Sequence, residues 1–215
     1  MSSKEFDLSR FEEEPVLGIV RGLTEKSLEG VMEAAIAAEL RHIEITLNTS
    51  NAFQLIEEAS KKYGAWLCIG AGTVLSSKEA EQALFSGAKF IVAPTLNADV
   101  ASFCRDSRLA YFPGALTPTE IEKAWNSGAA MVKVFPTSSV TPKYFKEVRG
   151  PFQNYRLMAT GGVNKVNVED YLSNGASAVA VGDSIFSLVR MENQEFDKIR
   201  KDLEDLIMVV KNFFL

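Results

Sequence analysis

The sequence predicts an α/β fold, a closed (β/α)8 TIM barrel formed by one domain of residues 1–215. Short β-rich runs alternate with longer amphipathic segments from end to end, which is typical of strands and helices in a parallel sheet. Eight such runs favour a closed barrel, and 215 residues approach the usual barrel length of about 250. The segments 86–88, 127–129 and 174–176 repeat a Gly-Ala step between a helix and a strand, where glycine supplies a C-cap.

The elements are expected in the following order. An N-terminal extension, residues 1–14, contains a short helix over 4–14 that closes the bottom of the barrel. The strands are expected at 16–21, 42–47, 66–70, 90–93, 110–112, 131–135, 156–159 and 178–182. Helices between them include 25–39, 50–63, 77–85 and 118–126, and a long C-terminal helix covers 193–215. An open doubly wound sheet is the alternative, but no Gly-x-Gly-x-x-Gly pattern follows the first strand.

Composition excludes several classes of partner. The net charge of -5 argues against nucleic-acid binding, which needs a basic face. No apolar run approaches the length of about 20 residues that a membrane-spanning helix requires. The first 14 residues have no apolar signal region, and Cys68 and Cys104 lack CxxC spacing. We therefore expect a cytoplasmic chain with reduced, buried cysteines.

Lys133 is the most informative residue, because it lies in the short apolar run Ala-Ala-Met-Val-Lys-Val-Phe-Pro at 129–136. A lysine is almost never fully buried unless it is paired or used chemically. Burial disfavours the charged amine, and a neutral amine can attack a carbonyl to form a Schiff base. A structural lysine paired with a carboxylate is the other interpretation of this segment.

Glu44 is the expected neighbour of that amine. In the second strand, alternation places Glu44 and Thr46 on one face and the isoleucines on the other. If the isoleucines face the helices, Glu44 points into the barrel with Lys133. A structural ion pair and a nucleophile with a proton shuttle both fit this arrangement.

Glycine-rich loops after the strands predict where a ligand binds, since barrel active sites lie at the C-terminal ends of the strands. Residues 70–75, Gly-Ala-Gly-Thr-Val-Leu, follow the expected third strand and place Thr73 at the mouth. Loops after strands seven and eight commonly bind phosphate. The candidate phosphate residues there are Gly161, Gly162, Gly182, Asp183 and Ser184. His42, the only histidine, begins the second strand at the opposite end, so we expect no metal site.

Taken together, these segments resemble the 2-keto-3-deoxy-6-phosphogluconate (KDPG) and 4-hydroxy-2-oxoglutarate (KHG) aldolase family, class I barrel aldolases. The resemblance runs from about residue 15 to residue 186. Its most specific segments are Glu-Ile-Thr-Leu at 44–47, Gly-Ala-Gly-Thr-Val-Leu at 70–75 and Lys-Val-Phe-Pro at 133–136. Further matches are Gly-Ile-Val-Arg-Gly at 18–22, Ala-Pro at 93–94, Phe-Pro-Gly-Ala at 112–115 and Thr-Gly-Gly-Val at 160–163.

The resemblance implies a cytoplasmic, homotrimeric lyase that needs no cofactor and no metal. Lys133 would form the Schiff base with a 2-keto acid, and Glu44 would move protons. Thr73 and Thr160 would bind substrate oxygens, while Pro94 and Phe135 would form the pocket wall. The products would be pyruvate and an aldehyde, glyceraldehyde 3-phosphate or glyoxylate, as in sugar acid catabolism of the Entner-Doudoroff type.

Two positions depart from the family's usual pattern. Well-known members have an arginine where this chain has Asn48, so Arg21 becomes the candidate ligand for the keto acid's carboxylate, with Asn48 beside it. A branch acting on 2-keto-3-deoxy-6-phosphogalactonate has a similar combination. Asp183 lies beside the expected phosphate loop, and we expect its carboxylate to point outward. The alternatives are that phosphogalactonate aldolase, a phosphate-binding barrel isomerase or epimerase, and a barrel that binds a sugar acid without turnover.

Overall fold

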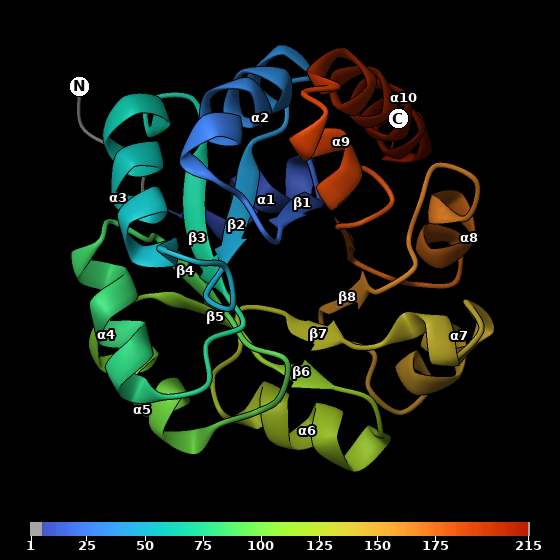
Figure 1. Cartoon of the computed structure of the whole chain (residues 1–215). Coiled ribbons are helices and arrows are strands. Elements are labelled where there is room, and N and C mark those ends of the chain that lie inside the picture. Colours follow the sequence, from blue (N-terminus) through green and yellow to red (C-terminus); the bar gives the residue numbers. More distant parts are fainter. Residues whose placement is uncertain (1–5, 215) are drawn as a thin grey trace.

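The computed structural model describes residues 6–214 and confirms the predicted (β/α)8 barrel. In Figure 1 the strands form a central ring and the helices surround it. The first strand pairs with both the second and the last, and the Ala130 N–H beside β7 donates to the Tyr111 carbonyl of β5, so the ring closes and the open doubly wound sheet is excluded. All strand pairs are parallel. The strands are β1 (Val16–Val20), β2 (His42–Thr46), β3 (Cys68–Gly72), β4 (Phe90–Val92), β5 (Ala110–Phe112), β6 (Gly114–Ala115), β7 (Val132–Val134), β8 (Leu157–Thr160) and β9 (Ala178–Val181).

The helices lie outside the ring, with the isoleucines of β2 packed against them in the larger core cluster. Their bounds are α1 (Leu8–Glu13), α2 (Glu25–Ala37), α3 (Ala52–Tyr63), α4 (Ser77–Phe85), α5 (Ala98–Asp106), α6 (Pro118–Asn126), α7 (Lys143–Arg149), α8 (Val168–Ser173), α9 (Leu188–Glu192) and α10 (Phe196–Phe214). Capping boxes fix the starts of α2, α4 and α6, because a Ser or Thr at the N-cap and the residue at N3 bond reciprocally.

Two strand predictions need correction. The third strand spans Cys68–Gly72 instead of 66–70, so Gly72 lies within it and not in the loop after it. A Cβ at Gly70 would lie 2.3 Å from the Phe90 ring, so the barrel interior requires a glycine there. The fifth strand continues past Phe112 as β6, with Pro113 between. The peptide N–H groups of Ala130 and Lys133 donate to the carbonyls of Tyr111 and Pro113, which joins this strand to β7.

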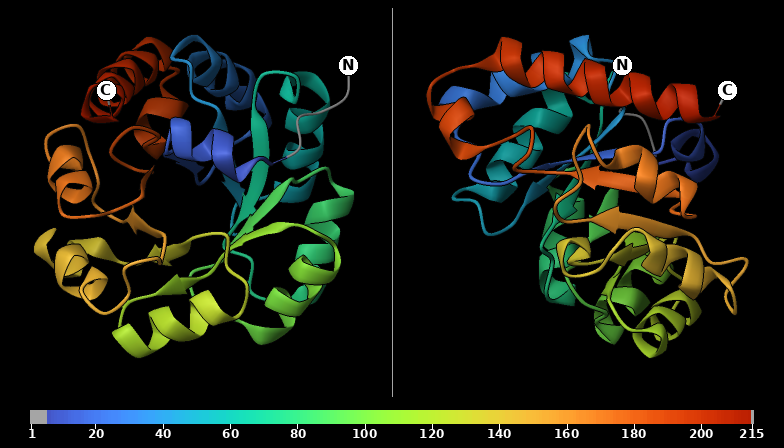
Figure 2. Two further views of the ribbon diagram at one scale, coloured as in Figure 1. Left: turned by 180° about the vertical axis from the view of Figure 1, so that it is seen from behind. Right: turned by 90° about the vertical axis from the view of Figure 1, so that its right-hand side faces the viewer.

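The terminal helices also differ in extent from the prediction. Helix α1 spans Leu8–Glu13, while residues 4 and 5 of the expected helix lie outside the described residues. The long C-terminal helix expected over 193–215 is confirmed as α10, which begins at Phe196, after Gln194 with its left-handed backbone φ of 56°; the short helix α9 precedes it. Residue 215 lies outside the described residues. Helix α10 packs against α2 and α8, and Figure 2 shows it lying along the outside of the barrel.

Aromatic side chains close the end of the barrel where the strands begin. Phe11 of α1 is fully buried, and its ring centroid lies 4.9 Å from that of His42 and 5.9 Å from that of Phe112. Phe90 packs edge-on against Phe112 at 5.8 Å. Burying an aromatic ring of this size stabilises a core by a few kcal/mol. The N-terminal segment therefore acts as a plug, and the open mouth lies at the opposite end.

Candidate active site

Lys133 lies on β7 with its side chain inside the barrel, between Val132 and Val134, which face the helices. The side chain is buried, with the residue only 6% exposed, and its Nζ lies 5.1 Å from the centroid of the Phe135 ring. Burial lowers the pKa of the Lys133 amine. The Glu44 carboxylate opposes that shift in pKa, and the Arg21 guanidinium adds to it. The amine therefore has more neutral, nucleophilic form than an exposed lysine.

Glu44 lies on β2 and points into the same interior, as its alternation with Ile43 and Ile45 predicts. It is 1% exposed, and burial raises the pKa of its carboxyl group to about 7, against the opposing effects of Lys133 and Arg21. Within the described part of the chain, its Oε2 has no hydrogen-bond partner. A carboxyl group that titrates near neutrality can donate and accept a proton at similar cost.

A cavity of about 370 Å³ opens above Lys133, at the C-terminal ends of the strands, and Glu44 is not among its lining residues. The cavity brings together most of the residues that the sequence predicts for substrate and phosphate. The lining residues are Ile19, Arg21, Thr73, Pro94, Lys133, Phe135, Thr160, Gly161, Gly162, Val163, Gly182, Asp183 and Ser184. Asn48 is exposed and is not among them, so the structure does not bring this predicted substrate ligand to the cavity.

Arg21 follows β1 at the cavity's rim, and its neighbours are anchored to the loop after β2. The peptide N–H of Gly22 donates to the Thr49 hydroxyl at 2.9 Å, and that hydroxyl lies 3.2 Å from the Thr46 hydroxyl. Both threonines are buried. These contacts hold the backbone beside Arg21, while Arg21 itself is exposed. No pattern in the sequence predicted this contact of Thr49.

The expected phosphate loops lie side by side at the mouth. Gly161 and Gly162 have positive φ values of 98° and 83°, which L-residues with side chains rarely adopt. In the described structure, the N–H groups of Gly162, Asp183 and Ser184 donate to no other group. The Ser184 hydroxyl donates to the Val163 carbonyl at 2.8 Å, so it ties the two loops together. The Asp183 side chain is exposed.

Sequence reasoning missed two further residues that shape the site. Gly72 lies beside Glu44, and a Cβ there would lie 2.3 Å from Glu44 Oε1. Thr137 is fully buried, and its hydroxyl donates to the Gly161 carbonyl at 2.7 Å. In the register of β2 and β3, Gly72 pairs with Thr46 and not with Glu44. The contact between Gly72 and the Glu44 side chain is therefore visible only in the three-dimensional packing. No pattern in the sequence identifies the second.

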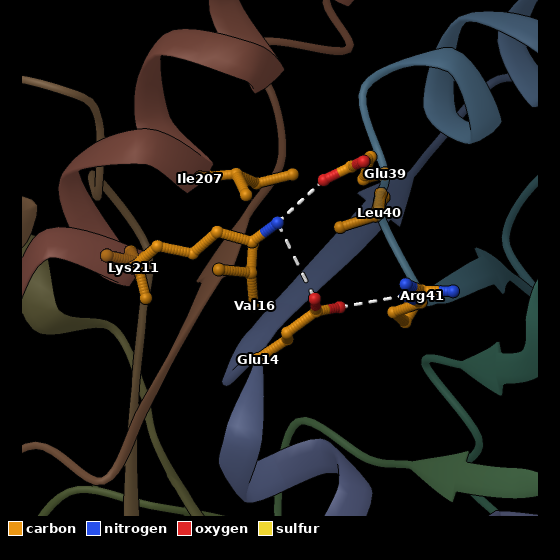
Figure 3. A pocket seen from close by; sticks show the side chains of 8 residues that line it. Glu14, Val16, Glu39, Leu40, Arg41, Ile207 and Lys211 are labelled. Atoms are coloured by element: carbon orange, nitrogen blue, oxygen red, sulfur yellow. Dashed lines mark hydrogen bonds and ion pairs between the residues drawn. The ribbon is translucent and has the colours of Figure 1, made fainter. Parts of the chain in front are cut away.

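A second hollow lies at the opposite end of the barrel, between α10 and the start of β1 (Figure 3). Its volume is about 10 Å³, room for about one water molecule. Lys211 pairs with Glu39 at 2.7 Å and with Glu14 at 3.6 Å, and Glu14 also pairs with Arg41 at 2.9 Å. Dashed lines in Figure 3 mark these contacts. These ion pairs hold α10 to the barrel, and the hollow is too small for a substrate.

Residues 6–214 contain no group of three or more His, Cys, Asp or Glu side chains placed to hold a metal ion. In the same range, no helix has the length and hydropathy needed to cross a membrane.

Comparisons with a family model, with curated relatives and with solved structures all lead to aldolases of one family. The model of the family described as "KDPG and KHG aldolase" matches residues 8–202. A "Probable 2-dehydro-3-deoxy-6-phosphogalactonate aldolase" from Rhizobium meliloti is 34% identical over 175 residues, covering 81% of this chain and 82% of the relative. A "2-dehydro-3-deoxy-phosphogluconate aldolase" from Pseudomonas aeruginosa is 35% identical, covering 74% and 71%. A solved structure called "Native KDPGal structure" superposes with a TM-score of 0.87 at 25% identity, covering 93% and 96%.

Proposed function

We propose that this chain, which belongs to the KDPG and KHG aldolase family, cleaves a 2-keto-3-deoxy-6-phospho-aldonate reversibly into pyruvate and glyceraldehyde 3-phosphate. As a member of that family it is a carbon–carbon lyase of class I, an aldehyde-lyase. One observation carries the proposed mechanism: the Lys133 amine and the Glu44 carboxyl group are both buried inside the barrel, near enough for the charge of each to affect the pKa of the other, and Lys133 lines the cavity. Burial shifts the pKa of each toward neutrality, which suits a nucleophile and a proton shuttle.

The reaction begins at Lys133. Its neutral amine attacks the C2 carbonyl of the keto acid, and a proton moves from nitrogen to oxygen to give a carbinolamine. The protonated Glu44 carboxyl donates to the C2 hydroxyl, which leaves as water, and an iminium remains. This iminium is the electron sink for the next step, so the chemistry proposed here requires neither a cofactor nor a metal.

Cleavage then depends on Glu44 as a carboxylate. It removes the proton of the C4 hydroxyl, the C3–C4 bond breaks, and the electron pair of that bond forms the enamine of pyruvate. The aldehyde leaves, and the Glu44 carboxyl returns its proton to C3. Water adds to the resulting iminium, the Glu44 carboxylate takes up the proton that this hydrolysis releases, and pyruvate and the free amine follow. A pKa of about 7 for Glu44 supports both halves of this cycle.

The remaining lining residues support the binding of a keto acid. Arg21 is the candidate ligand for the carboxylate, because a guanidinium pairs with a carboxylate through two parallel hydrogen bonds. Thr73 and Thr160 line the cavity and are the candidate hydroxyl ligands of the substrate's oxygens, while Pro94 and Phe135 supply apolar walls. The buried Thr160 lies next to the amine's strand, on β8. These roles are proposals for this chain.

The phosphate group would bind at Gly161, Gly162, Gly182, Asp183 and Ser184. Free N–H groups at Gly162, Asp183 and Ser184 are suitable donors to an anion. The Asp183 carboxylate would repel a phosphate, so the proposal requires that this exposed side chain at the cavity's rim points to solvent and that only its backbone N–H faces the ligand. Ser184 contributes through its N–H, because its hydroxyl proton is already given to Val163.

The position of Arg21 favours a second substrate, the C4 epimer 2-keto-3-deoxy-6-phosphogalactonate. Arg21, the arginine that lines the cavity, comes from the end of β1, whereas Asn48, after β2, lies outside the lining. The Rhizobium meliloti relative carries the name of an aldolase for that epimer. Both epimers share the mechanism above and differ only in where the C4 hydroxyl lies relative to Glu44.

The experiment is a comparison of kcat/KM for both phosphorylated epimers and for 4-hydroxy-2-oxoglutarate, which has no phosphate. The proposal predicts a clear preference for one phosphorylated epimer. A higher kcat/KM for the unphosphorylated acid would contradict the phosphate assignment. All three substrates yield pyruvate, so the rate of a coupled reduction of pyruvate measures each cleavage reaction.

We also propose that the enzyme is a cytoplasmic homotrimer. The support for the trimer is the resemblance of its motifs to a family that is usually trimeric. Met208, Phe213 and Phe214 near the end of α10 are exposed and give apolar surface for association. Light scattering coupled to gel filtration measures the mass, and a monomeric mass at micromolar concentration would contradict this proposal.

A further inference from the structure

The segment after β7 contains a hydroxyl group that has no role in the reaction steps above. Thr137 begins a short 3-10 turn, Thr137–Ser139, and is fully buried. Its hydroxyl donates to the carbonyl of Gly161 at 2.7 Å. Its own carbonyl accepts from the hydroxyl of Tyr171, on α8, at 3.4 Å. Thr137 is therefore bonded on both sides to the segment that follows β8.

The loop of Gly161 and Gly162 rests directly on this turn. A Cβ built on Gly161 would lie 3.5 Å from Phe135 and Pro136 atoms, and one on Gly162 would lie 3.2 Å from Ser138 Cβ. Both glycines have a positive φ, a backbone conformation that residues with a side chain rarely adopt. Packing alone leaves such a loop free to rotate its peptide groups. The bond from Thr137 to the Gly161 carbonyl fixes the orientation of the peptide between Gly161 and Gly162, and therefore of the Gly162 N–H.

This bond joins the two ends of the proposed substrate site. Lys133 is on β7, the strand that leads into Thr137, and would hold the substrate covalently at C2. The Gly162 N–H belongs to the proposed phosphate site, at the other end of the same molecule. A covalently held substrate cannot slide to find its phosphate donors, so their position relative to the amine matters.

We infer that Thr137 is a positioning residue that sets the phosphate-binding loop relative to the Schiff-base strand. It touches no substrate and acts through the Gly161 carbonyl. The inference rests on the proposed function, specifically on a phosphorylated substrate. Its effect falls on phosphorylated keto acids, and unphosphorylated ones, which do not use the loop, are unaffected.

The test compares Thr137→Val with Thr137→Ser. Valine keeps the shape of the side chain and removes the hydroxyl, which leaves the Gly161 carbonyl without its donor, and serine keeps the hydroxyl. We expect Thr137→Val to raise KM for the phosphorylated epimer preferred by the wild type about tenfold, the scale of one lost buried hydrogen bond. The kcat/KM for 4-hydroxy-2-oxoglutarate stays at the wild-type value, and Thr137→Ser restores most of the phosphate-dependent affinity.

Inhibition by inorganic phosphate gives a second readout that does not require turnover of a phosphorylated substrate. With 4-hydroxy-2-oxoglutarate as substrate, the inhibition constant of phosphate rises in Thr137→Val and returns toward wild type in Thr137→Ser. Tyr171→Phe removes only the bond to the Thr137 carbonyl and produces a smaller change in the same direction. This variant keeps the inference testable if Thr137→Val does not fold.

Three outcomes would overturn the inference. Equal losses on phosphorylated and unphosphorylated substrates would show a merely structural role for Thr137. An unchanged KM and an unchanged phosphate inhibition constant in folded Thr137→Val would show that the bond positions nothing. A wild-type enzyme that neither prefers the phosphorylated acid nor is inhibited by phosphate would overturn the phosphate assignment and this inference together, and so identifies failure of the proposed function.

Discussion

Gly72 makes room for the carboxyl group of Glu44. A Cβ at position 72 would lie 2.3 Å from Oε1 and 2.6 Å from Cδ of Glu44. Contacts that short force something to move, and Glu44 is enclosed on β2 with 1% exposure. The glycine on β3 is therefore part of what places the proton-carrying group in the barrel.

We expect Gly72→Ala to lower kcat strongly, by about 10- to 100-fold, because the displaced carboxyl group no longer serves general acid–base catalysis, which is worth about that much or more. Steady-state cleavage of the preferred keto acid measures the effect. The control is the same substitution in a Glu44→Gln background, where little further loss should follow. If Gly72→Ala lowered kcat by the same factor in the Glu44→Gln background as in the wild type, Gly72 would not act through Glu44.

Glu44→Gln should shift the pH dependence of Schiff-base formation to lower pH. The negative charge of Glu44 raises the pKa of Lys133, partly against the effect of burial. Removing that charge lowers the pKa of Lys133 further, so the amine becomes neutral at a lower pH. Trapping with pyruvate and cyanoborohydride at a series of pH values, followed by mass spectrometry, gives the midpoint.

A matched control for that shift is Asp183→Asn, which removes an exposed carboxylate at the rim of the same cavity. Its midpoint should stay close to that of the wild type. A shift to higher pH in Glu44→Gln would contradict the assigned electrostatic relation between Glu44 and Lys133.

Arg21 and Thr49 should act together on the affinity for pyruvate. Arg21→Ala removes the proposed carboxylate ligand and should raise KM for pyruvate in the synthetic direction by about 10- to 100-fold, as expected for a charged hydrogen bond. Thr49→Val removes the acceptor of the Gly22 N–H and should raise the same KM less. Thr49→Ser keeps that hydroxyl and serves as the control. An unchanged KM for pyruvate in Arg21→Ala would show that a group other than Arg21 binds the carboxylate of pyruvate.

The aromatic plug should affect stability without affecting chemistry. Phe11→Ala removes a fully buried ring from the contacts with His42 and Phe112. The free energy of unfolding should fall by about 3–5 kcal/mol, the usual range for such a truncation. Urea unfolding measures this, and kcat of the folded fraction should remain near wild type because the plug lies at the end away from the mouth. A large loss of kcat at full folding would show that the two ends are coupled.

The sequence predicts the barrel because its signals are local. Alternation in Ile43-Glu44-Ile45 and the apolar neighbours of Lys133 identify the two inward-facing groups, and the structure places both inside. The start of the third strand was wrong because Trp66 looks like a strand residue but is 54% exposed and precedes β3. Its glycines are typical of a loop, yet Gly70 and Gly72 lie within β3. These positions are glycines because Phe90 and Glu44 occupy the space that a side chain would need.

The parts of the site that could not be predicted depend on contacts between distant segments. The bond from Thr137 to Gly161 crosses from the β7 loop to the β8 loop, and the bond from Thr49 to Gly22 crosses from the β2 loop to the β1 loop. No residue spacing reports such contacts. Asn48 shows the reverse case, since its place in a motif predicted a ligand but the side chain lies outside the cavity lining.

The central claim is that the Lys133 amine forms a Schiff base with the keto acid, and borohydride reduction in the presence of pyruvate tests it most directly. The wild-type protein should gain one reduced pyruvyl group, located by peptide mass spectrometry at Lys133, and should lose activity irreversibly. Lys133→Ala should gain nothing and show no turnover, while Glu44→Gln should still be trapped, more slowly. An unmodified, active wild-type protein after this treatment, or a group found on another lysine, would contradict the account.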